Sequence, residues 1–172
     1  GGILAFSEVD RDARIYLKAS AGEDYYHLKK GEEKYIGIDK EILKLEQCVF
    51  VQGDLEIDDE LFLYTDVSGA RYPAAGNQKL KKRTAAGFVQ DAFDHEQCLV
   101  STQDGKRILL SGCAHNGILN ILDRYKEIFH SDPDMVISGF HLMKEGEYSP
   151  EEVLNIRDIA QELAGMDTVF YT

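Results

Sequence analysis

Apolar side chains recur at helical spacing in two stretches of this sequence. Over residues 118–129 they return every three or four positions, and charged side chains fill the opposite face. The second stretch opens with Ser149-Pro150-Glu151-Glu152, which offers a serine N-cap, proline at the first helical position and glutamate at the third. Its apolar stripe ends at Leu163, and Gly165 supplies a stop signal. The pattern therefore predicts two amphipathic helices.

Short runs rich in β-branched, aromatic and other apolar residues predict strands. The turn dipeptide Asp104-Gly105 separates two of these runs and indicates a tight hairpin. The later runs alternate with the two predicted helices, which favours a layered α/β fold with a mixed sheet. A short helix is also expected over residues 40–46. The predicted strands cover residues 14–19, 48–52, 60–67, 98–103, 106–111, 135–138 and 168–171.

Residues 68–93 show no clear period and are interrupted by glycine and proline. They predict a long loop, and such loops in compact domains usually cover a site or lack order. The segment carries the one basic cluster of the chain, formed by Lys79, Lys81, Lys82 and Arg83. A solvated loop face is the simpler interpretation, and a lid that binds an anion is the alternative.

Composition narrows the range of functions. The 172 residues suffice for one domain with its own core. With 31 acidic and 19 basic residues, the formal net charge of -12 repels phosphate backbones, which disfavours a nucleic-acid partner. No apolar stretch approaches the roughly 20 residues of a membrane-spanning helix. The odd count of three cysteines argues against a disulfide framework and favours a reducing, cytoplasmic setting.

Two histidines and a cysteine carry the candidate chemistry. Cys113 and His115 follow the apolar run of residues 107–110, which is expected to be a buried strand. Residues two apart on a strand face the same way, so these two side chains are candidates for one site. With His95 they could supply the three protein ligands of a mononuclear zinc site.

Each of these residues also has a simpler interpretation. His95 could be an exposed histidine paired with a neighbouring charge, Cys113 a small buried hydrophobe, and His115 a turn or capping residue. A second enzymatic hypothesis makes Cys113 a nucleophile with His115 or His95 as its base. Only histidine lies near enough in the sequence to lower the pKa of that thiol, which makes this hypothesis weaker.

Three segments together resemble the metallo-β-lactamase superfamily. They are residues 93–97 with Asp94-His95-Glu96-Gln97, residues 108–118 with Ser111-Gly112-Cys113-Ala114-His115, and residues 137–142 with Gly139-Phe140-His141-Leu142. Within the superfamily they are similar to the branch of metal-dependent hydrolases with S-G-C-[AS]-H and G-F-H-L segments. The resemblance extends over nearly the whole chain.

The resemblance implies an αββα sandwich with one or two divalent metals, usually zinc, in loops at one edge of the two sheets. It places His95 at the family's third-motif histidine and Cys113 at its fourth-motif ligand. His115 becomes an additional metal candidate, and His141 a residue near the substrate. A metal in such a site lowers the pKa of a bound water to about 7, so hydrolysis proceeds at neutral pH.

The sequence departs from the family pattern in two places. It contains neither the H-x-H-x-D-H motif nor the final G-H motif, and Gly1-Gly2 resembles the glycines that follow the first of these. The expectation is a single domain over residues 1–172, truncated at both ends. Its activity as a hydrolase would then be impaired.

The expected substrate is an unidentified small molecule. The basic cluster favours a phosphorylated one, contacted by Lys81, Lys82 and Arg83. The alternative is a non-catalytic remnant domain that binds a partner or self-associates through exposed sheet edges.

Overall fold

The computed structural model describes residues 2–144 and 146–172. Its residue contacts divide it into two compact units. Unit 1 comprises Gly1–Gly53 and Lys79–His95, and unit 2 comprises Asp54–Gln78 and Glu96–Thr172. Two such units are compatible with one domain, so the single-domain expectation stays a prediction.

Unit 2 is built on a six-stranded mixed sheet with the strand order β12-β11-β10-β9-β6-β5. The last three strands along the chain run parallel, so their carboxyl ends lie at one edge of the sheet. The predicted hairpin between β9 and β10 is present, and Asp104 and Gly105 both have the positive φ that a tight turn of this kind requires. The strands are β5 (Leu55–Glu56), β6 (Leu61–Tyr64), β9 (Cys98–Gln103), β10 (Lys106–Leu110), β11 (Met135–Ile137) and β12 (Val169–Tyr171).

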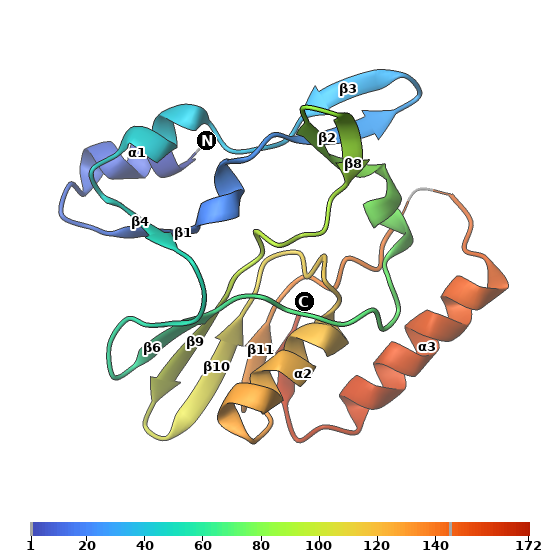
Figure 1. The fold of residues 1–172 in the computed structure, drawn as a ribbon. Coiled ribbons are helices and arrows are strands. Elements are labelled where there is room, and N and C mark those ends of the chain that lie inside the picture. Colours follow the sequence, from blue (N-terminus) through green and yellow to red (C-terminus); the bar gives the residue numbers. More distant parts are fainter. Residues whose placement is uncertain (1, 145) are drawn as a thin grey trace. The chain divides into compact units, whose positions relative to one another are not determined.

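Two helices cover one face of this sheet, α2 (Ile118–Phe129) and α3 (Pro150–Ala164) (Figure 1). Alternate strand residues point to the same face, and on this face they meet the apolar stripes of both helices. The predicted capping box of α3 is confirmed, because Ser149 accepts from the Glu152 backbone N–H while Glu152 caps the Ser149 N–H. The core includes Val100, Leu109, Val136, Ile118, Ile121, Leu122, Tyr125, Ile159 and Leu163.

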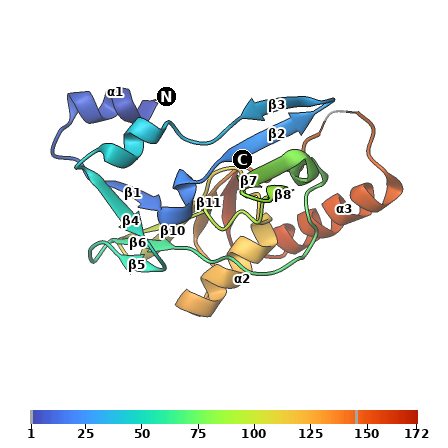
Figure 2. The same cartoon turned by 45° about the horizontal axis from the view of Figure 1, so that its top comes forward.

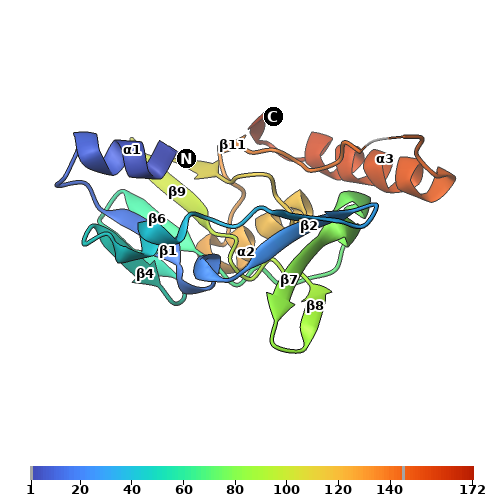
Figure 3. The same ribbon diagram turned by 90° about the horizontal axis from the view of Figure 1, so that it is seen from above.

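Unit 1 contains two small sheets. Strands β1 (Ile15–Lys18) and β4 (Cys48–Val51) pair in parallel. The second sheet is antiparallel, with the order β3-β2-β7-β8, and Figure 2 shows the β2–β3 hairpin. Its strands are β2 (Tyr25–Lys29), β3 (Glu32–Tyr35), β7 (Leu80–Thr84) and β8 (Gly87–Gln90), and the β7–β8 hairpin is clear in Figure 3. The helical segments are α1 (Gly2–Val9) and the 3-10 helices η1 (Ala19–Gly22) and η2 (Lys40–Lys44).

The structure corrects the expectation of a long loop over residues 68–93. A 3-10 helix, η3 (Ala75–Lys79), and strands β7 and β8 occupy most of that segment. The basic residues hide the strand pattern of β7, because long cationic side chains can pack along apolar surfaces. Arg83 does so, since its guanidinium lies 4.3 Å from the centre of the Tyr26 ring and 4.8 Å from that of Phe88.

The α/β fold class is confirmed, with several sheets and few helices. The short helix expected over residues 40–46 is the 3-10 helix η2. Among the described residues, no helix combines the length and apolarity that crossing a bilayer requires.

Candidate functional site

The loops after β10 and β11 bring two imidazoles together in unit 2. His115 follows β10 and His141 follows β11, and these neighbouring strands run parallel. Ligand sites of open α/β sheets commonly form at such carboxyl ends. The two rings have centroids 4.1 Å apart. The loops also touch through their backbones, where the Gly139 N–H donates to the Gly112 carbonyl over 2.8 Å.

Glu96 holds the His115 loop in place. Its carboxylate accepts hydrogen bonds from the backbone N–H groups of His115, at 2.8 Å, and Asn116, at 3.0 Å. The Asn116 side-chain amide donates a third, at 2.8 Å. The preceding residue, Ala114, has a φ of 57°, a left-handed conformation that non-glycine residues rarely adopt. The carboxylate thus stabilises a strained turn of the kind often found at functional sites.

A second contact fixes the His115 ring. Asn77 of η3 places its Oδ1 3.0 Å from His115 Nδ1, and its Nδ2 donates to the His115 carbonyl over 2.8 Å. The loop position of His115 agrees with the turn role considered for it, but its ring is also held by a specific partner.

His141 presents a buried nitrogen to this region. Within the described part of the chain, its Nε2 is buried and has no hydrogen-bond partner. Burial lowers the pKa of His141, while the charge of Glu96 acts in the opposite direction. A neutral imidazole is therefore favoured, and a neutral imidazole can accept a proton or bind a metal.

Cys113 is exposed rather than buried, so the interpretation as a core hydrophobe is wrong for this residue. It lines a cavity of about 460 Å³ together with His141, and most of the other lining residues are apolar. The lining consists of Cys113, Gly139, Phe140, His141, Leu142, Met143 and Thr172.

Unit 1 holds a second group of potential ligands. One ligand atom from each of Asp91, Asp94 and His95 lies within 4.8 Å of the other two. The Asp91 side chain is only 3% exposed, and it accepts from the Phe93 N–H over 2.8 Å. Burial raises the pKa of Asp91, whereas the Phe93 N–H and His95 lower it. A bound cation would favour the charged carboxylate that burial disfavours.

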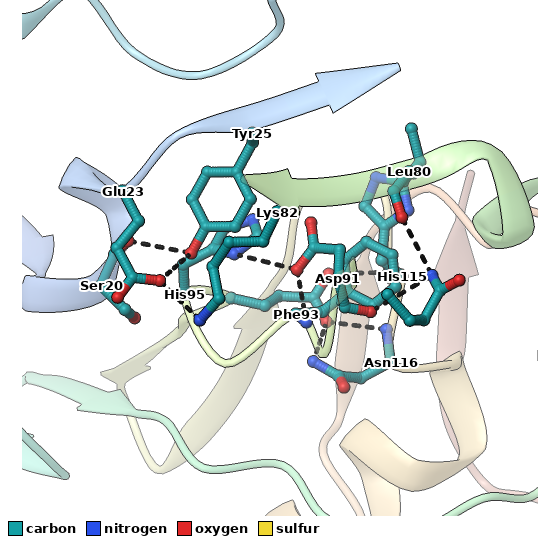
Figure 4. Close-up of polar contacts among 12 residues, drawn as sticks. Ser20, Glu23, Tyr25, Leu80, Lys82, Asp91, Phe93, His95, His115 and Asn116 are labelled. Atoms are coloured by element: carbon teal, nitrogen blue, oxygen red, sulfur yellow. Dashed lines mark hydrogen bonds and ion pairs between the residues drawn. The ribbon is translucent and has the colours of Figure 1, made fainter. Parts of the chain in front are cut away.

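The ring of His95 packs against Tyr25, with 4.2 Å between the ring centroids (Figure 4). Its Nδ1 faces Asp91 Oδ1 at 3.7 Å. His95 is therefore ordered by a ring on one side and a buried carboxylate on the other. Burial, with the nearby carboxylates of Asp94 and Glu23, raises the pKa of Tyr25, so its hydroxyl stays protonated.

The basic residues of β7 already have partners. Lys82 pairs with Glu23 at 2.7 Å, and this hydrogen bond raises the pKa of Lys82. Arg83 pairs with Glu33, and Lys81 donates to the Gln90 side chain over 2.8 Å. The role of Lys81, Lys82 and Arg83 in substrate binding stays a prediction.

The sequence-derived candidates fall into both units. His95 belongs to unit 1, whereas Cys113, His115 and His141 belong to unit 2. The metal-binding role of the His95, Cys113 and His115 trio stays a prediction. Asp91 and the positioning residues Glu96 and Asn77 were not among the candidates predicted from the sequence. The spacing of Asp91, Asp94 and His95 was an available signal, whereas the contacts of Glu96 and Asn77 depend on tertiary structure.

Comparisons with known proteins give a relative in sequence and a neighbour in structure. No known family model matches the sequence. The chain is 28% identical, over 145 aligned residues, to an uncharacterized protein of Methanocaldococcus jannaschii, covering 73% of this chain and 48% of that protein. The fold is similar to the crystal structure of Tm1679, described as a metal-dependent hydrolase of the beta-lactamase superfamily.

The match to Tm1679 has a TM-score of 0.69 and 31% sequence identity, and it covers 91% of this chain. The chain spans 58% of Tm1679 and 48% of the Methanocaldococcus jannaschii protein, which is about half the length of each of these two proteins.

Proposed function

We propose that the protein is a metal-dependent hydrolase of the beta-lactamase superfamily. The similarity to Tm1679 supports this proposal, since it combines 31% identity with agreement of the fold over 91% of the chain. The second support is chemical, because the described residues include potential metal ligands and a neutral imidazole.

The side chains present fit a divalent metal. Asp91, Asp94 and His95 offer carboxylate and imidazole donors within 4.8 Å of one another, and zinc accepts both donor types. In unit 2, His115 and Cys113 offer the nitrogen and sulfur donors that zinc also binds. The buried, unpartnered Nε2 of His141 is a further donor that a ligand or a metal would satisfy.

When bound, the metal would lower the pKa of a water molecule and polarise the bond under attack. The residues of this chain would position the site, accept a proton and contact the substrate. Glu96 holds the loop that carries His115. His141, neutral because burial lowers its pKa, would accept a proton or contact the substrate beside the Cys113 cavity.

The proposed substrate is a small molecule, and a phosphorylated one stays the favoured class. Lys81, Lys82 and Arg83 would have to exchange their present acceptors for a phosphate group.

The convergence of His115 and His141 at one sheet edge is the observation that carries the proposal. A panel of lactam, thioester and phosphodiester substrates, assayed with added zinc and again with chelator, tests it. We expect chelator-sensitive turnover of one class that His115→Ala abolishes and the control His130→Asn leaves unchanged. Turnover that chelator and His115→Ala both leave intact would contradict the proposal.

Self-association is a second candidate. Strand β12 is an edge of the six-stranded sheet, and its exposed face continues onto β11. Ile137, Val169 and Tyr171 are 43%, 52% and 55% exposed on that face. Unpaired edges with apolar side chains favour pairing between chains. Light scattering over a range of concentrations, with Tyr171→Lys as the variant, tests it, and a constant monomeric mass would contradict it.

A further inference from the structure

We propose that Asn77 is a positioning residue that holds the neutral His115 imidazole in the tautomer protonated at Nδ1, so that Nε2 carries the lone pair. Only the role of Nε2 in binding or catalysis rests on the proposed function. The tautomer itself follows from contacts within unit 2.

The contact with the His115 carbonyl fixes the orientation of the Asn77 amide. Its nitrogen lies 2.8 Å from the His115 carbonyl oxygen, which can only accept a hydrogen bond. The amide oxygen could not take this position, because two acceptors would then face each other. The contact therefore fixes which end of the Asn77 amide is NH₂ and which is oxygen.

The orientation of the Asn77 amide determines which ring nitrogen of His115 carries the proton. With the NH₂ group on the carbonyl, Asn77 Oδ1 is the atom 3.0 Å from His115 Nδ1. An amide oxygen only accepts, so Nδ1 must donate and must carry the proton. A neutral imidazole has one N–H, and the lone pair is then on Nε2.

The main chain around His115 has a second anchor besides Asn77. Glu96 accepts from the backbone N–H groups of His115 and Asn116. Asn77 in turn is anchored by its own N–H, which donates to the Ala74 carbonyl over 3.0 Å. Both partners of the contact between Asn77 and His115 therefore start from fixed backbones, which makes the ring orientation specific.

The same 3-10 helix reaches the second imidazole. A Cβ atom added to Gly76 would lie 3.0 Å from His141 Nε2, a distance tighter than most contacts of real Cβ atoms. Gly76 thus allows η3 to approach His141 while Asn77 contacts His115. This segment was expected to be a loop, whereas in the structure it is a 3-10 helix that contacts His115 and lies close to His141.

The contact with Asn77 preorganises the His115 imidazole. Histidines that bind metals usually donate their other ring N–H to a neighbouring acceptor, which fixes the tautomer and the ring direction. Asn77 provides this acceptor for His115, so that Nε2 is the ring nitrogen with the lone pair. Removing Asn77 would allow the proton to move to Nε2 and the ring to turn.

The test is ¹⁵N NMR of the histidine rings in the metal-free protein at about pH 8.5, two units above the ordinary pKa of histidine. We expect His115 Nδ1 to give a protonated, pyrrole-type shift and Nε2 a pyridine-type shift. Asn77→Leu should shift His115 toward the Nε2-protonated form. Gln78→Ala, an exposed neighbour in η3, should leave the spectrum unchanged.

A wild-type His115 protonated at Nε2 would overturn the inference, and this result needs no variant to fold. An unchanged tautomer in folded Asn77→Leu would overturn it as well. The measurement uses neither metal nor substrate. A failure of the hydrolase proposal would therefore leave these shifts as they are, and the two outcomes can be told apart.

Discussion

The ring centroids of His115 and His141 lie 4.1 Å apart, although the two residues belong to loops that follow different strands. The parallel pairing of β10 and β11 is the cause, because it brings the carboxyl ends of both strands to one edge. The site in unit 2 thus depends on sheet topology first and on side-chain contacts second.

Glu96→Gln should weaken the fold of the His115 loop. The carboxylate accepts three hydrogen bonds, and an amide oxygen cannot replace both carboxylate oxygens. We expect a loss of about 1–3 kcal/mol in the free energy of unfolding, measured by chemical denaturation. Glu60→Gln, an exposed residue of the same unit, is the control and should change stability by less than about 0.5 kcal/mol. Equal effects of both variants would show that the loop does not depend on Glu96.

The cysteines should differ in reactivity. Burial raises the pKa of Cys98 to about 11, so at pH 8 its thiol is almost entirely protonated and shielded. Cys113 is exposed. Iodoacetamide at pH 8, followed by mass spectrometry, should label Cys113 first and Cys98 only after unfolding. Early labelling of Cys98 would contradict the burial on which the core of unit 2 depends.

Asp134 should make stability depend on pH. The Arg107 backbone N–H, which donates to its carboxylate over 2.9 Å, lowers the pKa of Asp134, and Lys106 adds to the effect. A carboxyl group whose pKa is lowered in the folded state stabilises it above the ordinary value of 3.8. This stability is lost as the pH falls through the lowered pKa. Asp134→Asn should therefore be less stable than wild type at pH 7, with a smaller difference near pH 3, in urea denaturation at both values. A difference that grows toward low pH would contradict this.

The amphipathic helices and most apolar strands were predictable from the sequence. Helices α2 and α3 were predictable because their apolar positions repeat with the helical period. The capping box at Ser149 was predictable because it depends only on neighbouring residues. Strand β7 was not, since Lys81, Lys82 and Arg83 obscure its alternation, and the rings that accommodate Arg83 come from other strands.

The candidate site was predictable only in part. Cys113, His115 and His141 were found through short sequence motifs. Asn77 and Glu96 were not found, because each contacts His115 from a position distant from it in the sequence. Asp91 was missed because its burial, which gives its carboxylate unusual properties, is a property of the folded unit.

The most direct measurement of the central claim is the metal content of the protein after growth with added zinc. We expect about one or two equivalents of zinc per chain, removed by chelator and reduced in His95→Ala and His115→Ala but not in His130→Asn. Less than about a tenth of an equivalent in the wild-type protein would contradict the account.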